Sequence, residues 1–529
     1  MIVTKIEERL KSFQRGKDLE DIRRRREEDS VQLRKVKRSE HIAKKRALTG
    51  KVAQSTGDTS ESLTFGPDYI PQFLAQLHPA LLSDQLQDSE RLDRVLDLLS
   101  TSDFEVLTSA TEAIRKVLAA ETSPPINYIG LSPAASRLVS FLGTPHEPLV
   151  LESVWCVTNI CSGSSELVHR MISHGLLPAL MRLLSHTNEE IFDQTVWALS
   201  NIAGDSVAMR DQIISAGVGE FIREKLLATS RLHLGIIGNM VWLLSNLCRG
   251  KPLPKESFIA SLLPILPIGI HLEKEEIQAD ICWICSYITD GGDRVNINEL
   301  LNLKLLPKLV ELMLSPNAKV QAPALRTIGN IASGDTAQTQ MLLVAGCLDR
   351  LSVVLTSKRK ATRKEALWCL SNIAAGSCEQ RIEVMRSPCL SLAVQAVSDV
   401  DVDIKKEALW TIFNLANSKE IPIVASLLSK GILKILIPEL SHKDSNVLHP
   451  LLGCIECLLR PSHVEGVSSE SEVLFEELGG LTMLEKLQHH DNKAVYETVI
   501  RLMDEFYGLM AVEEEPQSEG VPQGGFAFS

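Results

Sequence analysis

Tryptophan and asparagine recur as a pair, four residues apart, through the middle of the chain. Five copies keep both residues: Trp155/Asn159, Trp197/Asn201, Trp242/Asn246, Trp368/Asn372 and Trp410/Asn414. Because residues i and i+4 share one face of a helix, each copy places an indole beside an amide. An asparagine amide both donates and accepts hydrogen bonds, so it can hold an extended peptide backbone whatever the peptide's side chains. Indole faces attract Lys and Arg termini and pack against their aliphatic stems.

Two variants of the pair lie between the third and fourth copies. Trp283 is followed by Tyr287, and Arg326 by Asn330. Acidic residues also stand near the pairs, namely Asp205, Asp280, Asp290, Glu365 and Glu407. Since carboxylates select cationic partners, the pattern favours a groove for an extended peptide rich in Lys and Arg.

Core packing that repeats with the fold is the alternative explanation for these residues. It fits tryptophans at a regular spacing. It fits the asparagines less well, because a buried asparagine needs hydrogen-bond partners. Six asparagines stand at the same offset. We therefore favour peptide binding over packing alone.

The elements that carry the pairs form an internal repeat. The first positions of successive motifs lie 42, 45, 41, 43, 42 and 42 residues apart. This period is typical of armadillo or HEAT helical repeats. Small residues follow each motif, then a short helical stretch, a glycine turn such as that at Gly175, and an apolar helix. The order predicts one short and two longer helices per repeat, which is the armadillo layout.

Weaker units without the Trp/Asn signature are expected around residues 102–120 and 444–460. Capping repeats often diverge in this way, and we expect about ten units in all. The chain of 529 residues is longer than one core allows, since single cores stop growing at roughly 250–300 residues. An elongated array of repeats satisfies that limit.

Composition excludes several classes of protein. No apolar run reaches the length of a membrane span, and the N-terminus lacks the apolar core of a signal peptide. Cys282/Cys285 and Cys454/Cys457 have metal-like spacing but lie in helical patterns without a second matching pair. We interpret them as buried thiols and expect neither a metal nor another cofactor.

The charge of the chain is unevenly distributed. Residues 1–51 hold 17 Lys and Arg against 9 Asp and Glu, a net charge of +8, and the remainder holds 38 against 58, a net charge of −20. Such a basic arm binds either an external polyanion or an acidic protein surface, including its own body. We expect the arm to be disordered alone and helical on a partner. Coiled-coil formation and nucleic-acid binding are the other interpretations of a basic run.

These features together resemble the importin-α (karyopherin-α) family across nearly the whole chain. Trp197–Asp205, Trp242–Arg249 and Pro323–Asn330 are close to the family's pattern, and Arg23–Arg38 is similar to its importin-β-binding segment. The resemblance implies an all-α fold, a right-handed superhelical solenoid of armadillo repeats with a flexible basic arm. It also implies a non-enzymatic adaptor that shuttles between cytoplasm and nucleus and carries cargo with a basic nuclear localisation signal. The expected domains are an importin-β-binding arm (1–51), a flexible linker (52–75), the armadillo domain (76–510) and a disordered acidic tail (511–529).

The resemblance implies two peptide sites, and a bipartite signal spans both. Asp205 and the carbonyl of Gly163 receive the deepest lysine ammonium of the major site. That site comprises Trp155, Asn159, Gly163, Trp197, Asn201, Gly204, Asp205, Asn239, Trp242 and Asn246. The minor site comprises Trp283, Tyr287, Arg326, Asn330, Thr339, Glu365, Trp368, Asn372, Glu407, Trp410 and Asn414.

The same resemblance assigns roles to the arm and to the last repeat. The importin-β-binding residues are Arg23, Arg24, Arg25, Arg26, Leu33, Arg34, Lys35, Lys37 and Arg38. Lys44, Lys45 and Arg46 look like a self-inhibitory sequence that occupies the acidic groove until importin-β withdraws it. The stretches Glu476–Gly480 and Leu487–Asp491 resemble the repeat that helps bind the CAS export receptor with RanGTP. Nucleoporins are further candidate partners, and no direct nucleic-acid binding is expected.

Three positions depart from the family's pattern. Val168 stands where a threonine usually helps bind the key lysine, and Gly238 stands where an arginine is common. Asn417–Glu420 replaces a glycine-rich turn. These departures indicate a divergent member with an altered signal preference.

Two rival functions remain. A general armadillo scaffold binds acidic or apolar peptides through a basic groove, and both the acidic body and the regular ladder argue against it. An enzyme is the second rival. The sequence contains no P-loop, Rossmann glycine signature, nucleophile elbow or paired zinc ligands, so we expect no catalytic residues.

Overall fold

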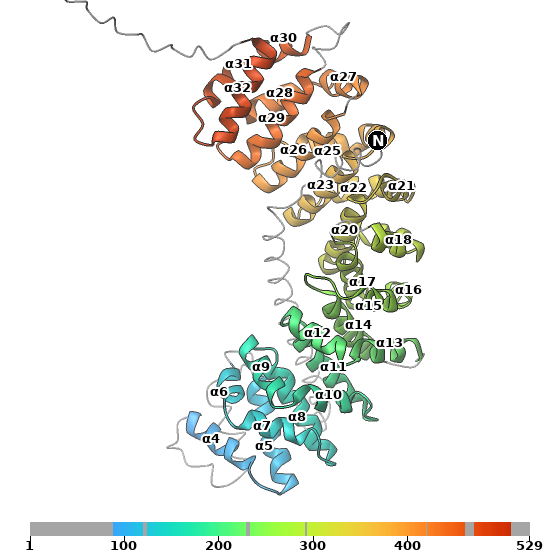
Figure 1. Ribbon diagram of the computed structural model, residues 1–529, viewed down its shortest axis with the longest axis vertical. Coiled ribbons are helices and arrows are strands. Elements are labelled where there is room, and N and C mark those ends of the chain that lie inside the picture. Colours follow the sequence, from blue (N-terminus) through green and yellow to red (C-terminus); the bar gives the residue numbers. More distant parts are fainter. Residues whose placement is uncertain are drawn as a thin grey trace, which may run out of the picture. The chain divides into compact units, whose positions relative to one another are not determined.

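The computed structural model describes residues 88–119, 124–228, 233–290, 294–418, 420–460 and 470–508. These ranges form the helices α4 to α32 and contain no strand (Figure 1), which confirms the expected all-α armadillo fold. The arm, the linker and the acidic tail lie outside the described residues. So do all residues assigned to importin-β binding and self-inhibition.

Each complete repeat consists of three helices. A typical repeat contains α9 (Ser165–Ser173), α10 (Leu176–Leu183) and α11 (Glu189–Ala203). The expectation of one short and two longer helices is therefore wrong, because two are short and one is long. The second helix stops early because the side chain of Asn188 accepts hydrogen bonds from the next backbone amides and starts a new helix as its N-cap.

A glycine with positive φ joins the two short helices in several repeats. Gly175 has φ 84° and Gly346 has φ 78°. A Cβ atom at either position would touch nothing, so the requirement is conformational and not steric. The glycine turns predicted from the sequence are confirmed here.

The third helix of each repeat is the long one, and in seven repeats it carries the Trp/Asn positions or their variants. Within the described ranges there are ten such helices: α5 (Phe104–Leu118), α8 (Glu147–Ile160), α11, α14 (Leu234–Cys248), α17 (Glu275–Ile288), α20 (Ala318–Ala332), α23 (Lys360–Ala374), α26 (Val402–Ala416), α29 (Ser445–Leu459) and α32 (Lys493–Tyr507). The two weaker units expected around residues 102–120 and 444–460 are α5 and α29.

The remaining helices are shorter and complete the repeats. They are α4 (Asp88–Leu98), α6 (Ile126–Leu131), α7 (Ala134–Phe141), α12 (Val207–Ser215), α13 (Val218–Ala228), α15 (Glu256–Leu262), α16 (Ile265–Ile270), α18 (Arg294–Asn302), α19 (Leu306–Leu312), α21 (Thr336–Val344), α22 (Cys347–Val354), α24 (Cys378–Arg386), α25 (Pro388–Ala396), α27 (Ile421–Ser429), α28 (Ile432–Glu439), α30 (Glu470–Glu477) and α31 (Gly480–Leu487).

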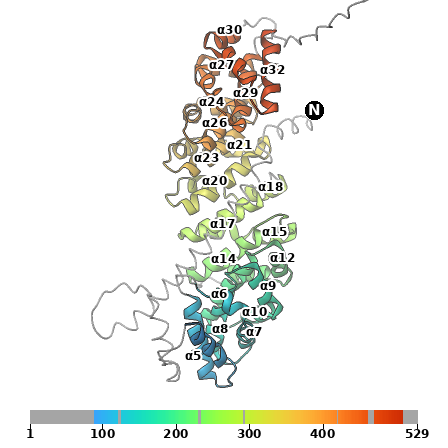
Figure 2. The same cartoon turned by 90° about the vertical axis from the view of Figure 1, so that its left-hand side faces the viewer.

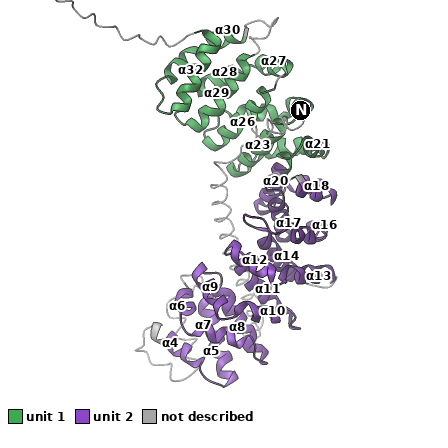
Figure 3. Cartoon of the chain, viewed as in Figure 1, with its two compact units in different colours: residues 1–13, 331–529 green, residues 14–330 purple. Residues whose placement is uncertain are grey.

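The described helices fall into two compact units, one ending at Asn330 and the other beginning at Ile331 (Figure 3). In the first unit, α5, α8, α11, α14 and α17 pack one on the next, and Figure 2 shows α5 beside α8. In the second unit, α23, α26, α29 and α32 do the same. Each unit therefore presents its Trp/Asn helices as neighbours, and the stacking gives a continuous apolar core.

The cysteines belong to that core. Cys282, Cys285 and Cys454 are fully buried, and burial raises the pKa of the Cys282 thiol to about 12. No group of three or more potential metal ligands occurs among the described residues. In the same ranges no single helix is long and apolar enough to cross a membrane. The bent pair α27 and α28 passes the test together, on the criteria of length and composition alone.

Candidate peptide-binding site

The first three Trp/Asn pairs lie on α8, α11 and α14, which are consecutive neighbours in the first unit. The rings of Trp197 and Trp242 meet edge to face, with centroids 5.6 Å apart and planes at 70°. This is a favourable arrangement for two indoles. The three Trp/Asn pairs of the predicted major site are thus brought to adjacent helices of one compact unit.

The asparagines of the ladder also have a structural role. Each is buried, with 2–6% of its surface exposed, and four of them donate an Nδ2 hydrogen bond to a carbonyl of the preceding repeat. The bonds run from Asn201 to Thr158 (3.0 Å), Asn246 to Ser200 (3.0 Å), Asn330 to Ser286 (2.9 Å) and Asn414 to Ser371 (2.9 Å). The packing explanation that we ranked second is therefore partly right. These asparagines tie neighbouring repeats together, and the amide of Asn330 donates a second hydrogen bond, to Thr289 Oγ1 at 3.2 Å.

The first pair of the ladder is different. Asn159 Nδ2 is buried without a hydrogen-bond partner among the described residues. The guanidinium of Arg115, from α5, lies 4.4 Å from the ring centre of Trp155 and forms an ion pair with Glu152. A cation of the chain itself thus occupies the indole face at the start of the ladder. This contact demonstrates that a ladder indole can accept a guanidinium next to a carboxylate.

A carboxylate and a carbonyl lie in the loops that follow α8 and α11. Asp205 Oδ1 accepts a hydrogen bond from the Ser165 hydroxyl at 2.6 Å. Asp205 Oδ2 is buried without a hydrogen-bond partner in the described part of the chain. In the same ranges the carbonyl of Gly163 accepts no hydrogen bond. An anionic oxygen and a carbonyl are acceptors suited to an ammonium group.

The other predicted residues of this site have structural partners. A Cβ on Gly163 would lie 2.8 Å from Leu167 Cδ1 and 3.1 Å from Ile126 Cγ2, which explains the need for glycine. The carbonyl of Gly204 accepts a weak hydrogen bond from Arg249 at 3.4 Å. Asn239 Nδ2 donates to Asp193 Oδ1 at 2.7 Å, across the junction of α14 and α11.

Val168 is fully buried on α9 and offers no polar group. It stands nine residues after Asn159, and Thr339 stands nine residues after Asn330. The Thr339 hydroxyl is also buried, and it donates to the backbone carbonyls of Asp335 (3.0 Å) and Ala332 (3.3 Å). The two repeats therefore differ by a hydroxyl at equivalent positions.

The predicted minor site is divided between the two units. In the first unit, Trp283 stacks on Tyr287 with centroids 5.6 Å apart, and α20 carries Arg326 and Asn330. Asp290, which the sequence suggested as a groove carboxylate, forms an ion pair with Lys251 at 3.3 Å. Because Lys251 already neutralises it, Asp290 is a weaker candidate than Asp205.

The second unit holds the rest of the minor-site residues on three helices. Trp368, Asn372 and Glu365 lie on α23, Trp410, Asn414 and Glu407 lie on α26, and Thr339 lies on α21. Both indoles are half-buried. Each unit thus contains an indole, an amide and a carboxylate on neighbouring long helices.

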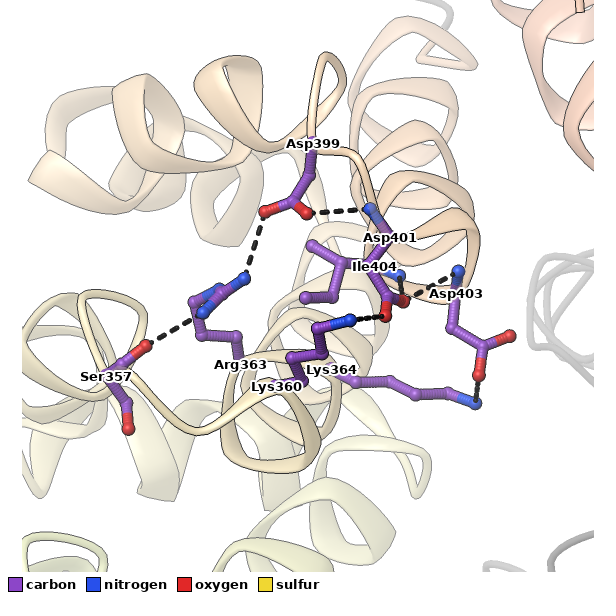
Figure 4. Close-up of polar contacts among 8 residues, drawn as sticks. All are labelled: Ser357, Lys360, Arg363, Lys364, Asp399, Asp401, Asp403 and Ile404. Carbon is purple, nitrogen blue, oxygen red and sulfur yellow. Dashed lines mark hydrogen bonds and ion pairs between the residues drawn. The ribbon is translucent and has the colours of Figure 1, made fainter.

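A set of ion pairs joins the repeats of the second unit, and these pairs were not predicted from the sequence. Figure 4 shows Arg363, Lys360 and Lys364 of α23 facing Asp399, Asp401 and Asp403 at the start of α26. The ion-pair distances are 3.0 Å, 3.0 Å and 2.9 Å respectively. The hydrogen bond from Lys360 is the main cause that lowers the pKa of Asp401. The signal was present in the sequence, since each cation precedes its carboxylate by about one repeat length.

Comparison with known proteins gives a consistent result over the whole length. Residues 9–112 match the importin beta binding domain, residues 164–204, 293–333, 335–375 and 377–417 match the armadillo/beta-catenin-like repeat, and residues 472–522 match an atypical Arm repeat. The chain is 42% identical to importin subunit alpha-B of Dictyostelium discoideum, over 99% of this chain and 98% of that protein. It is 36% identical to importin subunit alpha-3 of Arabidopsis thaliana, over 99% of this chain and 96% of that one.

A solved structure is similar in fold alone. The crystal structure of an engineered protein aligns with a TM-score of 0.70 at 22% identity, covering 78% of this chain and 98% of that protein. This likeness is independent support for the helical repeat architecture.

Proposed function

The chain belongs to the importin-α family, and we propose that the Trp/Asn pairs of α8, α11 and α14 hold the basic nuclear localisation signal of a cargo protein in extended form. The chain is a nuclear import adaptor that links such cargo to importin-β. Support for this comes from the match of residues 9–112 to the importin beta binding domain and from full-length similarity to importin α subunits.

The carboxylate of Asp205 is the observation that carries the cargo site. Its Oδ2 atom is buried without a hydrogen-bond partner among the described residues, in the loop that follows the Trp197 helix α11. A buried anionic oxygen without a donor is costly. A lysine ammonium supplies the missing donor, and its aliphatic stem packs between indole faces. The carbonyl of Gly163 is the second acceptor for that ammonium.

The second cluster of a bipartite signal binds, in this proposal, at the minor site. The half-buried indoles of Trp368 and Trp410 and the carboxylates of Glu365 and Glu407 supply the same chemistry there. The similarity of residue types on α23 and α26 to those on α11 and α14 supports this part of the proposal.

Control of the site resides in the arm. Lys44, Lys45 and Arg46 imitate a signal and compete for the groove from within the chain, at an effective concentration set by the linker. Importin-β binding through Arg23–Arg38 removes this competitor. Binding of CAS with RanGTP through the last repeat, and contacts with nucleoporins, are further parts of the proposed shuttling cycle.

The test measures the binding of a fluorescent peptide, Pro-Lys-Lys-Lys-Arg-Lys-Val, to the full chain by anisotropy. Four proteins are compared: the unaltered chain, the chain with Lys44, Lys45 and Arg46 changed to Ala, and that chain with either Asp205→Lys or Glu224→Lys. Glu224 lies on the exposed surface of α13, so it controls for the change in net charge. We expect tighter binding after the arm change, loss with Asp205→Lys, and no loss with Glu224→Lys.

The other outcomes separate the parts of the proposal. Equal binding by the first two proteins rejects self-inhibition and leaves the groove. Loss with both charge reversals rejects Asp205 as a specific receptor. Absence of binding by every protein rejects this class of signal and favours the general armadillo scaffold.

A further inference from the structure

Val168, nine residues after the first ladder asparagine, lacks a hydroxyl that the equivalent residue of a later repeat has. Val168 and Thr339 stand at equivalent positions, and Val168 is fully buried and apolar. A lysine ammonium has three N–H donors to satisfy. Asp205 Oδ2 and the Gly163 carbonyl account for two acceptors, so a site built only from these groups leaves one donor without a protein partner.

A different hydroxyl is present close by. Ser165 lies three residues before Val168, one turn earlier on α9 and on the same side of that helix. Its side chain is exposed, and its Oγ donates to Asp205 Oδ1 at 2.6 Å. A hydroxyl that donates one hydrogen bond keeps both lone pairs as acceptors. Ser165 is therefore adjacent to the receptor carboxylate and still able to accept.

We propose that Ser165 is the third acceptor of the lysine ammonium and sets the preference of this site for lysine. The inference rests on the proposed function. In the complex, one ammonium hydrogen is donated to Asp205 Oδ2, one to the Gly163 carbonyl and one to Ser165 Oγ. The Ser165 hydroxyl keeps its own hydrogen bond to Asp205 Oδ1, so the carboxylate stays oriented. No proton is transferred in this arrangement.

This arrangement discriminates between the two basic side chains. In the proposed complex three acceptors serve one compact ammonium group, which has three donors. A guanidinium is planar and presents its donors in a fixed fork, so it cannot satisfy all three acceptors at once. The Ser165 hydroxyl thus replaces the hydroxyl that Val168 lacks and favours lysine over arginine at the deepest position.

A purely structural role for Ser165 must be separated from direct acceptance. The bond from Ser165 to Asp205 joins two repeats, so its loss could lower affinity by letting Asp205 move. Loss of positioning weakens lysine and arginine peptides alike. Loss of an acceptor weakens the lysine peptide more, and this difference is the readout that decides between the two roles.

The experiment uses the full chain with Lys44, Lys45 and Arg46 changed to Ala. With an intact arm, the Ser165 substitution would weaken binding of the competing arm as well as binding of the peptide, and the loss of peptide affinity would be hidden. The probe is fluorescent Pro-Lys-Lys-Lys-Arg-Lys-Val, together with peptides in which each lysine in turn is replaced by arginine. The deep lysine is the one whose replacement most weakens binding to this parent protein. We then compare three variants of this parent protein. Two are the single variants Ser165→Ala and Ser164→Ala, and the third is a double variant that combines Ser165→Ala with Val168→Thr.

Ser165→Ala is expected to weaken the lysine peptide about tenfold, the effect of one hydrogen bond to a charged group. The penalty for arginine at the deep position should shrink in the same variant. Ser164→Ala is the matched control, because Ser164 is an exposed neighbour whose side chain caps nothing. Val168→Thr should restore binding in the double variant, since Cys161 and Ser164 offer backbone carbonyls equivalent to those that Thr339 uses.

Unchanged binding by Ser165→Ala overturns the inference and leaves the groove intact. An equal loss for lysine and arginine peptides also overturns it, because that result indicates positioning only. If the parent protein itself fails to bind any of these peptides, the proposed function fails first. Thermal unfolding of each variant identifies any loss of affinity that comes from misfolding.

Discussion

Asp205 of the first unit and three aspartates of the second unit meet different partners. Asp205, in the first unit, accepts only the neutral hydroxyl of Ser165 in the described part of the chain, and its second oxygen is buried without a donor. Asp399, Asp401 and Asp403, in the second unit, each face a Lys or Arg of the preceding repeat (Figure 4). The same chemical group therefore stabilises a repeat junction where the chain supplies the cation. It is available to a foreign cation where the chain does not.

Local backbone structure reinforces this difference. Asp401 is the N-cap of α26 and accepts hydrogen bonds from the amides of Asp403 and Ile404. Asp205 caps nothing, because Ser206 caps α12. Asp401 thus has a structural role that needs no ligand, whereas no described helix requires Asp205 as its cap. A carboxylate that caps no described helix and forms no ion pair in the described part of the chain is the better candidate for a binding role.

The largest expected effect comes from removing the charge of each aspartate without changing its shape. Asp205→Asn should weaken binding of a basic peptide by about ten- to a hundredfold, since a hydrogen bond to a charged group is worth about 1.5–3 kcal/mol. It should not lower the melting temperature, because a buried anionic oxygen without a donor is replaced by a neutral amide. Anisotropy and thermal unfolding of the same samples measure the two quantities.

Asp399→Asn is the matched variant in the other unit and should behave in the opposite way. It loses the ion pair with Arg363, so the melting temperature should fall, while peptide affinity should stay within about twofold because Asp399 is already paired with a cation of its own chain. A loss of affinity in Asp399→Asn equal to that in Asp205→Asn would remove the distinction between the two regions.

The asparagine ladder gives a second test, with stability as its readout. Asn201→Ala deletes the bond to the buried carbonyl of Thr158 and should lower the free energy of unfolding by about 1–3 kcal/mol, the cost of leaving a buried group unsatisfied. Asn159→Ala deletes an amide whose Nδ2 has no partner among the described residues, so its effect should be smaller. Equal losses of stability would mean that the inter-repeat bonds do not stabilise the fold.

The features of this protein that depend on local spacing could be predicted from the sequence. The Trp/Asn pairs fall on long helices because four residues are one helical turn, and Gly175 and Gly346 adopt the positive φ that the turn requires. The armadillo fold followed from the period, although the expected helix lengths were wrong. These signals are contained within one repeat. Because the chain carries several copies of the repeat, the shared pattern can be recognised from this one sequence.

Features that depend on contact between repeats were not predicted. The bond from Asn201 to Thr158 requires knowledge of which carbonyl faces the amide across a helix junction. The ion pairs of Arg363 and Lys364 lie between residues 36 and 39 positions apart, and only the stacking of repeats brings them together. The contact of Ser165 with Asp205 is of the same kind, so the sequence singled out Asp205 but not the hydroxyl beside it.

The ion pairs of the second unit supply a smaller and salt-dependent effect. Arg363→Ala removes both the pair with Asp399 and the hydrogen bond to the Ser357 carbonyl. We expect a loss of about 0.2–1 kcal/mol in the free energy of unfolding, because the pair is partly exposed. The loss should shrink in 1 M salt, where screening acts over about 3 Å. A loss that is unchanged by salt would assign the effect to packing of the arginine stem.

The smallest expected effect is a dependence on pH that comes from Asp401. The hydrogen bond from Lys360 is the main cause that lowers the pKa of this carboxyl in the folded chain, with help from the backbone amides of Ile404 and Asp403. A carboxyl whose pKa is lower in the folded than in the unfolded state binds more protons when unfolded. It therefore stabilises the fold above the unfolded pKa of about 3.9, and this contribution is lost as the pH falls through the folded value.

Thermal unfolding of the parent and of Lys360→Ala between pH 7 and pH 3 checks the sign. The difference between the two proteins should be a few tenths of a kcal/mol, about the size of a surface pair. It should stay constant down to about pH 4.5 and shrink below that, where Asp401 becomes protonated in both proteins. A difference that grows as the medium becomes more acidic would contradict the assignment, since it would require Lys360 to stabilise the protonated carboxyl.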